Sequence, residues 1–135
     1  MPYLVKEEPS NYAYDVFAKD GGTTWSGVKN PLAQKNLRSI RKGDLVFYYH
    51  TGDEKSVVGI ARAAGHAYPD PADKTGKAHV VDFVPVKKLK RPVTLAEIKA
   101  NKRFKDFPLT YLPRLSVMPV TDVQWKQILE ISERT

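Results

Sequence analysis

Strand-forming and helix-forming segments follow one another irregularly along this chain, and this order restricts the possible folds more than any other feature. Residues 3–6, 44–50, 56–64 and 79–88 favour strands, because they combine β-branched and aromatic residues between turn-forming boundaries. Helix-like segments lie among these strands without the regular β-α-β alternation of a parallel sheet. We therefore predict an α+β fold with a small, mostly antiparallel or mixed sheet or barrel.

Local signals place the helices. Two capping boxes, at residues 94–97 and 121–124, predict helices that run to about Ala100 and Ser132. Shorter helices are expected over residues 14–19 and after Pro31, and Gly43 is expected to end the second of these. A turn is expected at residues 9–11, and Pro85 implies an edge position or a bulge. The side chains expected to face the core from these helices are Val16, Phe17, Leu32, Leu37, Ile40, Val123, Ile128, Leu129 and Ile131.

Positive charge is concentrated in one segment of the chain. The 135 residues carry a net charge of +7 and suit one domain over 1–135. Residues 87–105 hold Lys87, Lys88, Lys90, Arg91, Lys99, Lys102, Arg103 and Lys105 against the single acid Glu97, so eight minus one gives the whole excess. Such a patch suits a polyanion, with phosphates expected at Lys87, Lys88, Lys90, Arg91, Lys102 and Arg103. A lysine-rich face that only serves solubility is the alternative.

Several classes of function find no support in the sequence. The absence of cysteine excludes disulfides, thiolate metal sites and cysteine nucleophiles. No phosphate loop, dinucleotide fingerprint, zinc helix or serine elbow is present, and His50, His66 and His79 are too widely spaced for a local metal motif, so neither a metal nor a cofactor is expected. The acidic start and the lack of a long apolar stretch predict no membrane contact and a location in the cytoplasm or in a eukaryotic nucleus. A monomer is also expected.

Aromatic and polar residues occur together at the ends of the expected elements. Trp25 and Asn30 flank a glycine turn, Tyr48, Tyr49 and His50 finish a strand, and Tyr68 lies in a loop. An aromatic surface beside an amide suits a nucleobase, because the ring stacks and the amide reads the base edge. Since Tyr48 and Tyr49 alternate on a strand, one of them is expected in the core, and Trp25 has a core alternative too.

Five blocks in fixed order resemble the EVE domain, a family that includes thymocyte nuclear protein. They are residues 3–9 (YLVKEEP), 24–30 (TWSGVKN), 43–50 (GDLVFYYH), 67–71 (AYPDP) and 114–120 (RLSVMPV), and residues 90–99 are also similar. The resemblance implies a PUA-like fold, a compact β-barrel or strongly curved mixed sheet with short flanking helices, related to YTH and ASCH domains. It also implies recognition of a modified DNA base, chiefly a modified cytosine, flipped into an aromatic pocket.

The same resemblance assigns residues to the pocket. They are Lys6, Glu8, Trp25, Lys29, Asn30, Tyr48, Tyr49, His50, Tyr68, Arg114 and Ser116. Lys29, Thr51 and Met118 depart from the family pattern, where arginine, serine and glutamine are usual. If the glutamine reads the base edge, Met118 would alter base preference.

Three hypotheses follow. In the first, Trp25 and a tyrosine stack on a flipped base, and Asn30 and Ser116 bond to its edge. In the second, an RNA reader uses the same residues, since only a 2′-hydroxyl contact separates the two nucleic acids. In the third, a hydrolase of modified cytidines, as in ASCH relatives, pairs Lys6 with Glu8 on one strand face, where a salt bridge is the structural alternative.

Overall fold

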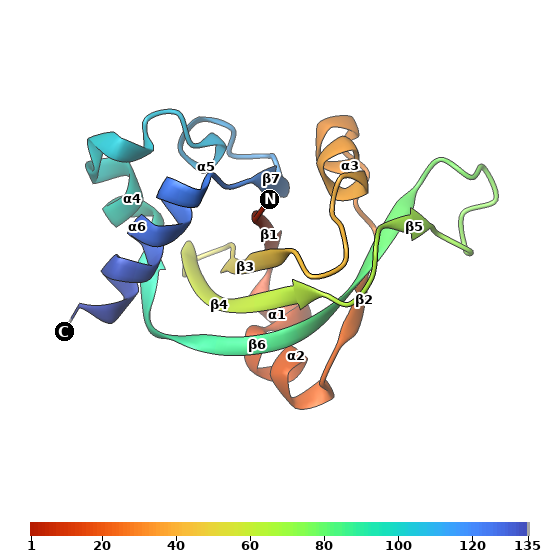
Figure 1. The fold of residues 1–135 in the computed structure, drawn as a ribbon, viewed down its shortest axis with the longest axis horizontal. Helices are drawn as coiled ribbons and strands as arrows, with labels where there is room; N and C mark the ends of the chain where they lie inside the picture. The colour runs from red at the N-terminus through yellow and green to blue at the C-terminus, as the bar shows by residue number, and fades with distance from the viewer. Residues whose placement is uncertain (135) are drawn as a thin grey trace.

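The computed structural model describes residues 1–134, which form a seven-stranded sheet with short helices around it (Figure 1). The strands are β1 (Tyr3–Glu7), β2 (Thr23–Trp25), β3 (Leu45–His50), β4 (Ser56–Ala63), β5 (Tyr68–Pro69), β6 (His79–Thr94) and β7 (Val117–Pro119). The helices are α1 (Pro9–Tyr12), α2 (Tyr14–Asp20), α3 (Pro31–Arg38), α4 (Leu95–Ala100), α5 (Pro108–Tyr111) and α6 (Asp122–Glu133), with a 3-10 turn η1 (Lys102–Phe104).

The sheet mixes one parallel pair with antiparallel pairs. Its strand order is β2-β6-β4-β3-β1-β7, and β5 pairs with β6 beside this path. β1 runs parallel to β3, so that Lys6 lies opposite Tyr49, whereas β7 is antiparallel to β1 on its other side. The expected α+β class with a mixed sheet is confirmed, and the short strands β2 and β5 are additions that the sequence did not indicate.

The sheet is strongly curled. Figure 1 shows β6 sweeping under β4 and bending upward toward α4, so that the sheet resembles half a barrel. Ala61 pairs with Pro85 and Ile60 with Lys87, which leaves Val86 as an extra residue on β6. Bulges of this kind bend a strand and increase its twist, and the bulge expected at Pro85 is confirmed.

Local caps fix where the helices begin. Thr94 and Glu97 exchange side-chain and backbone hydrogen bonds at the start of α4, and Thr121 and Gln124 do the same at α6. Both predicted capping boxes are therefore confirmed. At α3 the Asn30 side chain accepts from the amide of Ala33 at 3.0 Å, in front of the expected Pro31.

Five local expectations are corrected. Residues 9–12 form the short helix α1 rather than a turn, and α3 ends at Arg38, so that Gly43 instead forms a left-handed turn before β3. Val16, Leu32 and Val123 are 48%, 45% and 66% exposed, although we expected them in the core. Helices of four to twelve residues offer too few turns for periodicity to define the buried face.

Aromatic rings fill the space between α2 and the sheet. Tyr14 and Phe17 of α2 meet Tyr48 of β3, and the Tyr14 and Tyr48 centroids are 5.3 Å apart in an edge-to-face arrangement. Tyr14 also donates from its hydroxyl to the carbonyl of Ile60 at 2.8 Å, and its ring lies directly on Gly59 of β4. This cluster anchors the end of β3, from which Tyr49 points to the opposite side.

Candidate nucleic-acid interface

A hollow of about 300 Å³ lies between the start of α3 and the segment that follows α5. We call it the amide–arginine hollow, and Asn30, Leu32, Leu112, Pro113, Arg114 and Leu115 line it. Because the Asn30 side-chain oxygen caps α3, the amide is held in one orientation, and its Nδ2 group makes no hydrogen bond within residues 1–134. Arg114 is exposed, so both polar side chains offer donors beside three leucines.

A second hollow, of about 350 Å³, lies above the ends of β1 and β3. We call it the Tyr49 hollow, and Lys6, Tyr49, Lys55, Lys99, Tyr111 and Pro113 are among its walls. The Lys6 ammonium donates to the Pro113 carbonyl at 3.0 Å and lies 5.7 Å from the Tyr49 ring centroid. Burial lowers the pKa of Lys6 and raises the pKa of Tyr49 to about 12.

The two hollows meet at Pro113, which lines both. Lys6, Asn30 and Arg114, taken from three separate blocks of sequence, are therefore brought to one continuous surface, and Tyr49 from a fourth block lies beneath it with 3% of its surface exposed. A rigid sheet supplies Lys6 and Tyr49, and loops supply the other two, which is how binding surfaces are commonly built.

Three other predicted pocket residues, Trp25, Tyr48 and His50, are buried. Trp25 is 6% exposed and packs edge-on against Tyr48 and Phe83. Tyr48 is fully buried, donates from its hydroxyl to the Tyr12 carbonyl, and has a pKa that burial raises. Stacking of a base on either ring would require opening the core, so the structure corrects this part of the expected pocket to a packing role.

His50 is also structural. Its Nε2 accepts from the Tyr14 amide at 3.0 Å, and its Nδ1 lies 3.0 Å from a Glu54 carboxylate oxygen. An accepting Nε2 requires the proton on Nδ1, which then donates to Glu54. This buried imidazole joins the start of α2 to the end of β3 and is withdrawn from the surface.

The remaining predicted residues lie apart from the hollows or have local partners. Tyr68 of β5 donates to Asp82 at 2.8 Å, and β5 is far from α5 in Figure 1. Glu8 caps α1 rather than bonding to Lys6, so the pair that a hydrolase would use is not formed in this conformation. Lys29 is exposed, and Ser116 contacts Lys6 through its backbone carbonyl at 2.9 Å.

Met118 is fully buried on β7, opposite Leu4 of β1. A buried thioether in the sheet cannot touch a base at the surface. The expected influence of Met118 on base preference is therefore corrected to a packing role, and Thr51, which lines the Tyr49 hollow, is the departure from the pattern that lies at the site.

The basic segment 87–105 does not form one uniform patch. Lys88 is paired with Asp15 at 2.9 Å, and Arg91 makes two bonds to Glu97, at 3.0 and 2.9 Å, and a third to the Ile131 carbonyl. Arg91 therefore ties β6 to α4 and α6, and the phosphate contacts expected at Lys88 and Arg91 would have to compete with these bonds. Other basic residues of the segment that we expected to bind phosphate are exposed, namely Lys87, Lys90, Lys102 and Arg103.

A sequence model described as the EVE domain matches residues 2–131, nearly the whole chain. The chain belongs to the EVE domain family.

Relatives of this EVE domain include both curated proteins and solved structures. Human thymocyte nuclear protein 1 is 29% identical over a region that covers 83% of this chain and 60% of the human protein, so the chain spans about three fifths of that relative. A protein of Rhodopseudomonas palustris, solved by NMR, is 44% identical with a TM-score of 0.92, covering 97% of this chain and 92% of the other. The crystal structure of human THYN1 in complex with DNA containing 5-methylcytosine is 26% identical with a TM-score of 0.85, covering 99% and 98%.

Some surface residues of this EVE domain were missed in the sequence. Lys55 and Tyr111 line the Tyr49 hollow, but they come from a turn and a short helix that carry no binding motif, whereas Lys99, which also lines it, was counted in the basic segment 87–105. An aromatic ring and a guanidinium lie on either side of a proline in the run Tyr111-Leu112-Pro113-Arg114. This pattern could have indicated a binding surface.

Two further properties concern residues 1–134. No cluster of three or more histidine, aspartate or glutamate side chains in this range is arranged to hold a metal ion. None of the helices in the same range has the length and apolar character needed to cross a membrane.

Proposed function

We propose that this EVE domain binds DNA and recognises a modified cytosine, which it holds in the amide–arginine hollow. The observation that carries the proposal is the relative solved with DNA containing 5-methylcytosine, which matches this chain over 99% of its length. The hollow adds independent support, because its volume of about 300 Å³ is at the lower end of the sizes typical of small-ligand sites.

The polar groups of the hollow suit the edge of cytosine. Asn30 offers its Nδ2 hydrogens and Arg114 its planar guanidinium, so both are donors. The Watson–Crick edge of cytosine presents two adjacent acceptors, N3 and O2, which a fixed pair of donors can satisfy once the base is flipped out of the helix. Flipping costs a few kcal/mol, which the pocket contacts must recover.

The leucines of the hollow provide the basis for reading a 5-methyl group. Leu32 is 45% exposed and lines the hollow together with Leu112. Burying one methyl group contributes about 0.8 kcal/mol, which corresponds to about a fourfold preference for 5-methylcytosine over cytosine.

Fluorescence anisotropy with matched oligonucleotides tests the proposal. Duplexes and single strands carrying cytosine, 5-methylcytosine, 5-hydroxymethylcytosine or N6-methyladenine are titrated, and RNA of the same sequence is used as competitor. Leu32→Ala should lower the preference for 5-methylcytosine toward one, whereas Leu45→Ala, an exposed leucine at the start of β3 away from the hollow, should leave it unchanged. Asn30→Ser keeps a capping oxygen and removes the amide donor, so it should weaken binding without melting α3.

Two results would contradict the proposal. One is equal affinity for modified and unmodified cytosine in both single and double strands. The other is a preference that survives Leu32→Ala and Asn30→Ser, since the base would then bind elsewhere on the domain.

A further inference from the structure

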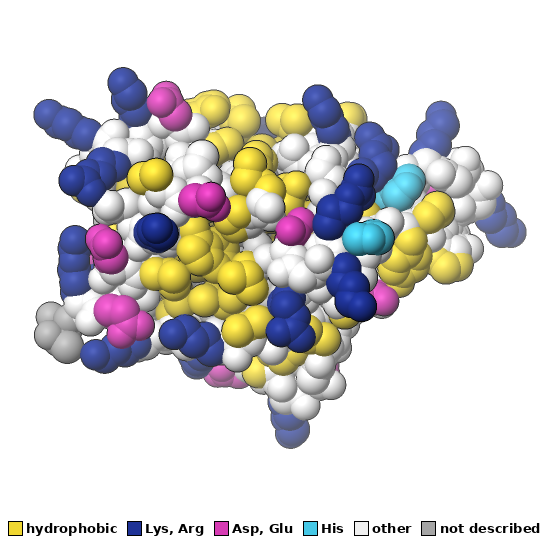
Figure 2. Space-filling model, in the orientation of Figure 1, with side chains coloured by type: hydrophobic (Ala, Val, Ile, Leu, Met, Phe, Trp, Pro, Cys, Tyr) yellow, Lys and Arg dark blue, Asp and Glu magenta, His cyan; other side chains and the backbone are white. Residues whose placement is uncertain are grey.

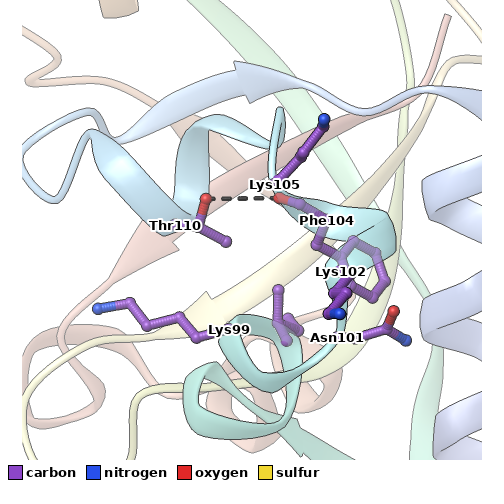
Figure 3. A pocket seen from close by; sticks show the side chains of 7 residues that line it. Lys99, Asn101, Lys102, Phe104, Lys105 and Thr110 are labelled. Atoms are coloured by element: carbon purple, nitrogen blue, oxygen red, sulfur yellow. Dashed lines mark hydrogen bonds between the residues drawn. The ribbon is translucent and has the colours of Figure 1, made fainter.

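Three lysines surround a third hollow, of about 520 Å³, next to the Tyr49 hollow. Figure 3 shows Lys99 extending from α4, Lys105 from the end of η1, and Thr110 on α5 beside them, with Lys102 on η1. No acidic side chain lines this lysine hollow. Within residues 1–134, none of the three lysines forms an ion pair, in contrast to Lys88 and Arg91 of the same basic segment.

The lysine hollow continues into the Tyr49 hollow. Lys99 and Thr110 line both, and the second adds Lys6 and Lys55 without any carboxylate. We call the joined surface the lysine groove. It leads through Pro113 to the amide–arginine hollow, so a base held there would have five lysines along one path leading away from it.

Lys55 is held in this groove at a conformational cost. Its φ of +42° lies in the left-handed region, the only such value among the non-glycine residues of the part of the chain described. Its carbonyl accepts from the Leu95 amide at 2.8 Å, which ties the β3–β4 turn to α4. Glycine would adopt this conformation more easily, so a lysine here is consistent with a role for its charge.

Tyr111 presents an aromatic surface beside the lysines. It is 55% exposed, lines the Tyr49 hollow and makes no side-chain hydrogen bond within residues 1–134. A ring of this kind is able to stack on a base whose face is uncovered. Bases of an intact duplex are covered by their neighbours, so the ring favours a single strand.

We propose that the lysine groove binds the sugar–phosphate backbone of a single nucleic-acid strand, with Tyr111 stacked on one of its bases. The groove contacts are independent of base modification, and the inference depends on the proposed function only for the class of ligand. Figure 2 shows basic side chains around the edge of a face whose middle, between α6 and β4, is hydrophobic.

The salt dependence of binding measures the number of phosphates contacted. Each neutralised phosphate of a single strand contributes about 0.7 to the slope of log affinity against log salt concentration. The five lysines would give a slope of up to about 3.5, and removal of three would lower it by about 2.

The test measures the affinity for an unmodified single-stranded oligonucleotide of twelve nucleotides by fluorescence anisotropy, at salt concentrations between 50 and 200 mM. The variant Lys99→Gln, Lys102→Gln, Lys105→Gln is compared with Lys19→Gln, Lys74→Gln, Lys77→Gln, which makes the same charge change at exposed positions outside the groove. We expect the slope to fall by about 2 in the first variant only. Equal slopes in the two variants would overturn the proposal, because binding would then depend on net charge.

Two single variants separate charge and stacking from folding. Lys55→Gly should lower the slope by about 0.7 while the melting temperature stays the same or rises, because glycine relaxes the left-handed turn. Tyr111→Ala should weaken single-strand binding at least about fivefold and leave duplex binding unchanged. Equal losses for single strand, duplex and dextran sulfate would show a non-specific polyanion surface and refute the strand assignment.

These measurements distinguish failure of the lysine-groove proposal from failure of the function proposed for the amide–arginine hollow. If the groove proposal is wrong, the ratio of affinities for 5-methylcytosine and cytosine persists while the lysine variants keep their slope. If the proposed function is wrong, that ratio is one while unmodified single strands still bind with a lysine-dependent slope.

Discussion

Gly59 of β4 is the position where one added methyl group should be most damaging. A Cβ built on it would lie 2.7 Å from Cδ2 of Tyr14 and closer still to two other atoms of that ring. The ring has no room to retreat, because Tyr14 is 2% exposed, packs edge-on to Tyr48 and is held by its hydroxyl bond to the Ile60 carbonyl. Either the ring or the β4 backbone must move.

The expected cost follows from this geometry. Overpacking typically costs 1–3 kcal/mol, and because a hydrogen bond and several ring contacts are disturbed together we expect about 3 kcal/mol for Gly59→Ala. For a domain of this size that lowers the melting temperature by roughly 10 °C. The measurement is the free energy of unfolding from urea titration followed by circular dichroism, with thermal melts in parallel.

Gly65→Ala is the matched control, since no heavy atom lies within 4 Å of its built Cβ and its φ is outside the left-handed range. We expect a change within about 0.5 kcal/mol. In a Tyr14→Leu background the added methyl should cost less than about 1 kcal/mol, because the ring it strikes is gone. A cost for Gly59→Ala that is negligible, or that is the same in both backgrounds, would refute the packing argument.

Three further predictions concern the core and its charged groups. Trp25→Ala should lower the free energy of unfolding by roughly 3–5 kcal/mol in urea titrations, so any loss of binding should vanish once the folded fraction is corrected for. Arg91 lowers the pKa of Glu97 to about 2, so the stability that this pair contributes is present above the unfolded carboxyl value near 4.5 and is lost as the pH falls toward 2. Urea titrations between pH 6 and pH 2 should show a smaller loss for Glu97→Gln than for the wild type. Tyr49 should stay protonated until the pH approaches 12, so the part of the 295 nm absorbance titration that a Tyr49→Phe variant loses should lie near that pH, and a loss at lower pH would contradict the burial of Tyr49.

Short-range signals predicted much of the fold. The strands around residues 3–6, 44–50 and 56–64, the two capping boxes and the bulge at Pro85 were all visible in the sequence, because each depends on residues within a few positions. The exposure of Val16 and Leu32 was not visible in the sequence, since the helices that carry them are only seven and eight residues long. Tertiary contacts, rather than periodicity, decide which side of so short a helix is buried.

The candidate site was predictable only in part. Asn30 was recognisable beside a glycine turn, and Arg114 only through the family resemblance, whereas Trp25 and Tyr48 look the same in sequence whether they line a pocket or fill a core. Their burial depends on Tyr14, supplied by a different segment, and on Phe83. Lys55 and Lys99 become neighbours only because the β3–β4 turn bonds to the start of α4.

The position of β1 has a consequence for how the domain forms. The first strand of the chain lies between β3 and β7, and Tyr3 pairs with both Val46 and Pro119. One edge of β1 can therefore be paired only after β7 is available. Pairings between residues so distant in sequence slow folding to the millisecond-to-second range. During synthesis this edge stays open until residues 117–119 have left the ribosome, a period in which it can pair with other nascent chains.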